Sequence, residues 1–108
     1  MGVFWAPPES VELEFDARVT PYVRGRVWHE SQRIDDLADG RIRVTLNVSN
    51  DWALRSWILG FGSAVRVVQP AALAETIRHE LRLACARYEA DPDVRSSSKD
   101  TARPPLAF

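Results

Sequence analysis

The feature that most constrains the fold is a run of eight residues, Arg41–Val48, in which apolar and polar side chains alternate strictly. Because successive side chains of a strand point to opposite faces, the run predicts a strand with one buried face and one face in water. A chain that contains it must form a sheet and cover one side of that sheet with other elements. The apolar and polar sets are Ile42, Val44, Leu46 and Val48, and Arg41, Arg43, Thr45 and Asn47.

Three further segments predict strands. Residues 11–15 alternate in the same way, with the apolar side chains at the odd positions. Residues 33–37 form a weaker pattern, and Asp39-Gly40, which tolerates the positive φ of a tight turn, is expected to join them to Arg41–Val48 as an antiparallel hairpin. Residues 64–69 are short and rich in valine, so we expect a buried strand that Pro70 ends.

Three segments have helical spacing. The first starts after Asp16, a potential N-cap, and ends at Gly25; the second is capped by Asn50 or Asp51. The third begins at Pro70 and is expected to bury one apolar stripe about four turns long. The stripe consists of Leu73, Ile77, Leu81, Ala84 or Cys85, and Tyr88.

The resulting order is strand, helix, strand, strand, helix, strand, helix. This order predicts an α+β fold, a ferredoxin-like βαββαβ sandwich with an additional C-terminal helix. Residues 11–90 are expected to form this domain. Residues 91–108, rich in serine and proline, are expected to be a flexible tail.

Composition excludes several classes of protein. The 14 Lys and Arg residues and 15 Asp and Glu residues give a net charge of -1, which argues against a DNA-binding domain that works mainly through phosphate contacts. No apolar run reaches the roughly 18 residues of a membrane span, and the first residues do not resemble a secretory signal. The single cysteine favours a reducing, cytoplasmic setting.

The sequence offers no candidate catalytic residue, metal site or cofactor site. His79-Glu80 begins a zinc-protease pattern, but Leu83 stands where the second histidine is required. Cys85 lies in the predicted apolar stripe and is expected to be a core residue. Trp52 and Trp57 are interpreted as core and boundary residues of the second helix. We therefore do not expect an enzyme.

Four sequence elements together carry a family resemblance: Pro21-Tyr22-Val23-Arg24, Trp28-His29-Glu30-Ser31-Gln32, Trp57-Ile58-Leu59-Gly60-Phe61-Gly62 and Val67-Val68-Gln69-Pro70-Ala71-Ala72-Leu73. In order and spacing they resemble the C-terminal extension (WCX) domain of WYL-domain transcriptional regulators of bacteria. The resemblance runs from about Val11 to Tyr88. It implies a ferredoxin-like fold, and it implies that residues 1–10 are a linker from an upstream WYL domain.

The resemblance also implies a function in transcription regulation. Such an extension is expected to act without catalysis in dimerisation and docking, against the WYL and helix-turn-helix domains of the parent regulator, with no direct DNA binding and no membrane contact of its own. The chain is expected to form a homodimer. The alternative is an effector-binding module that contacts a nucleotide or a short single-stranded nucleic acid, with Arg26, Arg41 or Arg43 on phosphate.

The segment from Trp28 to Gln32 is the candidate working surface. It carries more hydrogen-bonding groups than a simple turn requires, but the same groups are also suited to stabilising the loop itself. His29, if it lies at an interface, would make association pH-sensitive. The candidate interface or effector residues are Arg26, Trp28, His29, Ser31, Gln32, Arg41 and Arg43.

Overall fold

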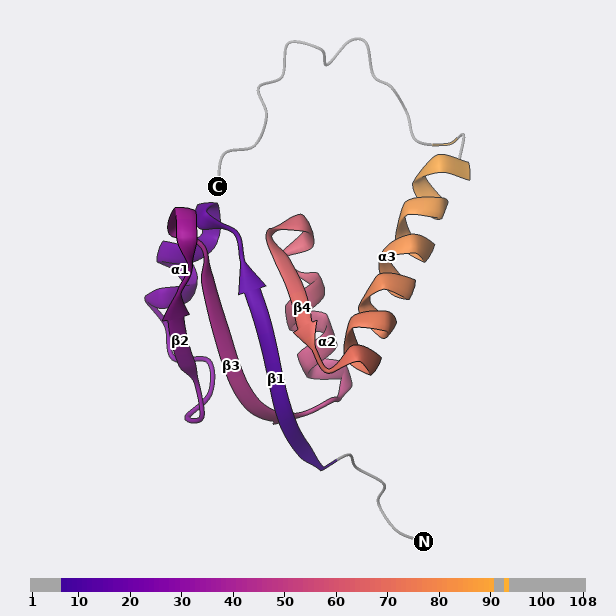
Figure 1. Ribbon diagram of the computed structural model, residues 1–108. Coiled ribbons are helices and arrows are strands. Elements are labelled where there is room, and N and C mark those ends of the chain that lie inside the picture. Colours follow the sequence, from indigo (N-terminus) through magenta and orange to yellow (C-terminus); the bar gives the residue numbers. More distant parts are fainter. Residues whose placement is uncertain (1–6, 91–92, 94–108) are drawn as a thin grey trace, which may run out of the picture.

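The computed structural model describes residues 7–90 and residue 93. Its centre is a four-stranded antiparallel sheet in the order β2-β3-β1-β4 (Figure 1). The strands are β1 (Pro8–Phe15), β2 (Arg33–Asp36), β3 (Ile42–Ser49) and β4 (Val65–Gln69). The predicted α+β class is therefore confirmed. The expected linker over residues 1–10 and the expected tail over residues 91–108 lie largely outside the described residues.

The helices are α1 (Thr20–Arg24), α2 (Trp52–Leu59) and α3 (Ala71–Ala90), with 3-10 turns η1 (Ala17–Val19), η2 (Ala38–Gly40) and η3 (Gly62–Ala64). All three α-helices contribute side chains to one core, which they share with the apolar faces of β1 and β3. The buried residues are Val11, Leu13 and Phe15 of β1, Ile42, Val44 and Leu46 of β3, Val23, Leu54, Ile58, Leu73 and Ile77 of the helices, and Val67 of β4.

Local chemistry explains the predicted hairpin. Asp39 has φ 62° and Gly40 has φ 80°, so both occupy the left-handed region that the sequence indicated. The turn pairs β2 with β3 in a register that places Asp35 opposite Arg43. The next prediction is also confirmed, because the Asp51 carboxylate accepts a hydrogen bond from the backbone N–H of Leu54 at 2.9 Å and caps α2.

Two predictions about early and late elements were wrong in detail. The first helix is divided into η1 and α1, and the Asp16 side chain makes no cap hydrogen bond; it pairs with Arg18. The strand expected to be buried, β4, is an edge strand of the sheet that, within the described part of the chain, pairs with β1 alone and buries one residue, Val67. Because this antiparallel sheet packs one face on the core, each strand needs only one covered face, and a short valine-rich segment satisfies that requirement equally well.

The apolar stripe of α3 is buried for only half of its length. Leu73 and Ile77 belong to the core, but every residue from Arg78 to Ala90 is exposed, including Cys85 and Tyr88. The prediction of a core cysteine was wrong because α3 extends beyond the edge of the sheet, as Figure 1 shows. Trp52, also expected near the core, is 74% exposed at the first position of α2.

Candidate functional site

The loop from Trp28 to Gln32 is held in one conformation by its own polar side chains. The side-chain oxygen of Gln32 accepts a hydrogen bond from the backbone N–H of Trp28 at 2.7 Å, and its NH2 group donates to the carbonyl of Arg26 at 3.0 Å. The Trp28 indole N–H donates to the carbonyl of Val23 at 3.1 Å. These three bonds attach the loop to itself and to the end of α1.

Ser31 fastens the loop to the sheet. Its hydroxyl accepts a hydrogen bond from the backbone N–H of Asn47 at 2.8 Å, two positions past the last pair, Arg33 and Thr45, in the register of β2 and β3. The backbone N–H of Ser31 donates to Nδ1 of His29 at 3.1 Å, and the Ser31 hydroxyl lies 2.7 Å from the same nitrogen. Because Nδ1 acts as an acceptor, the neutral His29 ring carries its proton on Nε2.

Aromatic rings pack against one another beside the loop. The rings of Trp28 and Trp57 lie 5.1 Å apart between centroids, and Phe61 packs edge-on against Trp57 at 5.4 Å. Tyr22 lies 5.6 Å from Trp28 and is covered by the Arg26 guanidinium at 4.6 Å. Such contacts add to the stability gained by burying the rings and fix their orientation.

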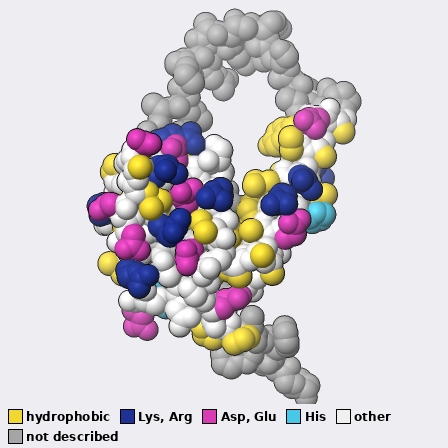
Figure 2. Space-filling view, viewed as in Figure 1, with side chains coloured by type: hydrophobic (Ala, Val, Ile, Leu, Met, Phe, Trp, Pro, Cys, Tyr) yellow, Lys and Arg dark blue, Asp and Glu magenta, His cyan; other side chains and the backbone are white. Residues whose placement is uncertain are grey.

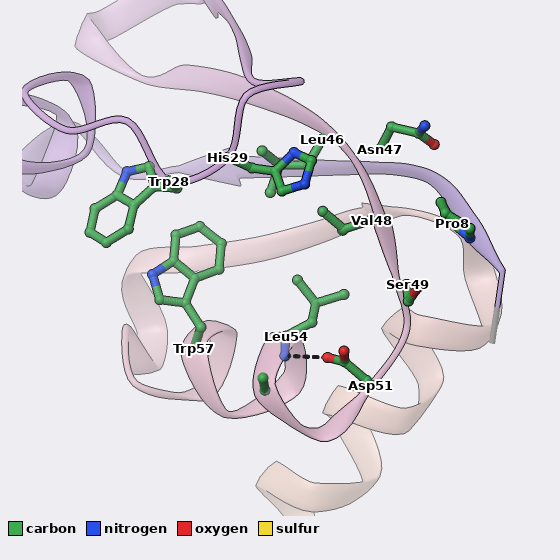
Figure 3. Close-up of a pocket in the computed structure, with 11 residues that line it drawn as sticks. Pro8, Trp28, His29, Leu46, Asn47, Val48, Ser49, Asp51, Leu54 and Trp57 are labelled. Carbon is green, nitrogen blue, oxygen red and sulfur yellow. Dashed lines mark hydrogen bonds between the residues drawn. The ribbon is translucent and has the colours of Figure 1, made fainter. Parts of the chain in front are cut away.

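A hollow opens between this loop and α2 (Figure 3). Trp28 and Trp57 stand next to each other at one end, and Pro8 of β1 lies at the other. The apolar part of the lining comes from Leu46, Val48 and Leu54, whereas His29, Ser49 and Asp51 supply polar groups. A concave apolar surface with a few polar groups suits contact with an apolar side chain of a partner.

A second hollow lies on the other side of the two tryptophans. It is lined by Val19, Tyr22, Trp28, Ser56, Trp57, Gly60 and Phe61. The Trp28 and Trp57 rings therefore contribute to both hollows. We call the residues lining the two hollows the tryptophan surface.

Two of the seven candidate residues, Trp28 and His29, line this surface; three others support it, and two lie elsewhere. Ser31 and Gln32 hold the loop, and Arg26 lies before it and covers Tyr22, whereas Arg41 and Arg43 project from the opposite face of the sheet. There Arg41 pairs with Glu14 at 3.0 Å, and Arg43 lies 3.9 Å from Glu12. The buried Nε of Arg43 makes no hydrogen bond within the described part of the chain.

That opposite face is a mixed-charge surface. Glu14, largely buried, also pairs with Arg66 of β4 at 3.1 Å. The strand alternation predicted which side chains share this face, but their pairing depends on which strands become neighbours. Sequence reasoning missed the contribution of Trp57 and Asp51 to the tryptophan surface, because both fitted ordinary helix roles.

The described residues contain neither a metal-ligand cluster nor a membrane-spanning helix. No three His, Cys, Asp or Glu side chains in residues 7–90 and 93 lie together as metal ligands. Within the same residues, no helix has the length and apolar character that crossing a membrane requires.

Comparison with known proteins gives a matching family model and a curated relative. Residues 7–84 match the family model of the WCX domain. Over 94 residues the chain is 32% identical to Protein PafC of Mycobacterium tuberculosis, in strains CDC 1551 / Oshkosh and H37Rv. The match covers 79% of this chain and 29% of PafC, so the chain spans less than a third of the length of these curated relatives.

Proposed function

Because the chain belongs to the WCX family, the C-terminal extension of WYL-domain regulators, we propose that it is a non-catalytic regulatory domain of a helix-turn-helix transcriptional regulator. In this proposal the domain docks onto the WYL domain or between subunits and contributes to homodimerisation. The DNA is bound by other domains. The strand order β4-β1-β3-β2, with every neighbouring pair antiparallel, supports a ferredoxin-like arrangement.

The observation that carries the proposal is the tryptophan surface. Gln32 and Ser31 use their side chains to hold the loop, which leaves Trp28 and His29 in a preformed position beside the hollow. A surface held in its bound shape loses little conformational entropy when a partner binds. Aromatic residues are also the side chains most often responsible for affinity at protein interfaces.

The nucleotide-binding alternative has less support. Arg41 and Arg43, its phosphate contacts, lie beside the carboxylates of Glu14 and Glu12. Those carboxylates would repel a phosphate that approached the same face. Arg26 lies on the other side of the sheet, over Tyr22, so the three arginines do not converge on one ligand.

The first test is to determine what the complete reading frame that contains residues 1–108 encodes. We expect a helix-turn-helix and a WYL domain upstream; a frame that encodes neither would contradict the proposal.

The second test measures docking. The upstream part is expressed separately and titrated with the 108-residue chain in a calorimeter. Ala53→Arg places a long cation in the first hollow and is expected to weaken binding about tenfold or more, since exposed Ala53 lines that hollow. Ala72→Arg is the matched control, because Ala72 is likewise exposed and likewise the second residue of its helix. Equal affinity for both variants would contradict docking at the tryptophan surface.

A further inference from the structure

The stripe that anchors α3 to the core continues along the helix after the core ends. Leu73 and Ile77 are buried, and the same side of the helix then presents Leu81, Ala84 and Tyr88. With 100° between successive residues, these five positions fall within about 40° of Ile77. Leu81 is 44% exposed and Tyr88 is 75% exposed. The helix therefore carries an apolar surface that is continuous with the core but that no described residue covers.

Among residues 7–90 and 93, little stabilises the exposed half of α3. The 13 residues from Arg78 to Ala90 are exposed on every side of the helix, and Figures 1 and 2 show this half as an arm that leaves the body of the domain. Isolated helices shorter than about 12 to 15 residues are marginal in water. An apolar partner along the stripe would supply the missing stabilisation.

A groove lies where the arm leaves the sheet. It is lined by side chains of β4 and α3, among them Val65, Val67, Ile77 and Leu81. The groove adjoins the stripe, and it can receive a large side chain that approaches along the helix.

Charges beside the stripe favour one orientation for the partner. Glu80 and Arg87 lie on the same flank of the helix and seven residues apart, about 10.5 Å along its axis, too far for an ion pair within the helix. Neither has an ion-pair partner among residues 7–90 and 93. When two such helices pack antiparallel, like flanks meet, so Glu80 of each faces Arg87 of the other. Parallel packing instead brings this flank against the other flank, where Arg78 already pairs with Glu75 and Glu89 already accepts a hydrogen bond from the Cys85 thiol.

We propose that two copies of this chain associate through α3, antiparallel and related by a two-fold axis. This inference deepens the proposed function and rests on its assembly role. Ile77 then packs against Tyr88 of the second copy, and Leu81 packs against Ala84 of the second copy. Tyr88 of each copy reaches the groove between β4 and α3 of the other. The Glu80–Arg87 pair forms twice, which is what a self-complementary interface requires.

The test is the association of the 108-residue chain, followed by sedimentation equilibrium over a range of concentrations. The wild-type chain is expected to dimerise, and Leu81→Gln is expected to weaken the dimer about tenfold or more. Leu83→Gln is the matched control, since Leu83 is 49% exposed but points away from the stripe. The proposal is overturned if the wild-type chain stays monomeric at every concentration, or if Leu81→Gln and Leu83→Gln lower the dimer affinity equally.

Charge reversal tests the orientation. Glu80→Arg alone and Arg87→Glu alone each create two like-charge contacts and are expected to weaken the dimer about fivefold. The double variant restores both pairs in exchanged positions and is expected to recover wild-type affinity. A double variant weaker than either single variant would overturn the antiparallel arrangement. Docking to the upstream domains through the tryptophan surface is measured separately, so failure of α3 pairing is distinguishable from failure of the proposed function.

Discussion

Gln32 and Trp28 are joined by a hydrogen bond of 2.7 Å from the backbone N–H of the tryptophan to the side-chain oxygen of the glutamine. The nitrogen of the same Gln32 side chain donates a hydrogen bond to the backbone carbonyl of Arg26, so this one side chain holds both ends of the loop. The position of the Trp28 ring, and with it the shape of both hollows, depends on this closure.

Gln32→Ala is expected to lower the free energy of unfolding by about 1 to 2 kcal/mol, because two hydrogen bonds of the loop are lost. Urea unfolding monitored by tryptophan fluorescence measures the effect. Gln69→Ala is the control, since Gln69 is an exposed glutamine at the end of β4. Similar losses in the two variants would contradict the role assigned to Gln32.

Ser31→Ala is expected to speed hydrogen exchange of the Asn47 amide about fivefold, since the serine hydroxyl that accepts its hydrogen bond is removed. Amide exchange followed by NMR measures the rate. Ser63→Ala, which removes a hydroxyl bonded to Arg18, should leave the Asn47 amide unchanged. An unchanged Asn47 rate in Ser31→Ala would show that the loop is not fastened there.

Asp51→Ala is expected to destabilise the chain by about 1 kcal/mol, because α2 loses the carboxylate that caps its first turn. Asp51→Asn keeps an acceptor oxygen and is expected to retain most of the stability. Thermal unfolding followed by circular dichroism compares the two. Equal destabilisation by alanine and asparagine would rule out the cap as the cause.

Glu14→Gln is expected to lower the free energy of unfolding by at most about 1 kcal/mol. The arginine partners of Glu14 are partly exposed, so water already screens these ion pairs. The loss should shrink as salt is added. Glu9→Gln, an exposed position on the same strand, is the control for removing a negative charge. A large loss that does not depend on salt would contradict this account.

Glu89 raises the pKa of the Cys85 thiol, first through a hydrogen bond and then through its negative charge. At a pH below that raised pKa, less of the reactive thiolate is present than in an ordinary exposed cysteine. Glu89→Gln is expected to lower the pKa and so speed alkylation of Cys85 by iodoacetamide at pH 8. Glu75→Gln, on the same helix but away from the thiol, is the control; equal rates in the two variants would contradict the effect of Glu89.

Much of the local structure could be predicted from short-range pattern. The alternation in β3 predicted its buried face, Asp39-Gly40 predicted the turn that joins β2 to β3, and Asp51 was one of two predicted caps of α2. These features depend on backbone conformation and on neighbours a few residues away, which the sequence shows directly. The same reasoning showed that the segment from Trp28 to Gln32 carries more hydrogen-bonding groups than a simple turn requires, and it identified the candidate residues within the segment.

The partners of those residues were decided by tertiary structure. Ser31 continues the register of the β2–β3 hairpin and so reaches Asn47, but Trp28 meets Trp57 across a separation along the chain that no spacing rule relates. The apolar stripe of α3 shows the same limit. Periodicity determined that Ile77 and Leu81 share one side of the helix, but whether that side is covered depends on how far the sheet extends beneath it. The sheet ends at β4, so Ile77 is buried, while Leu81, Cys85 and Tyr88 are exposed.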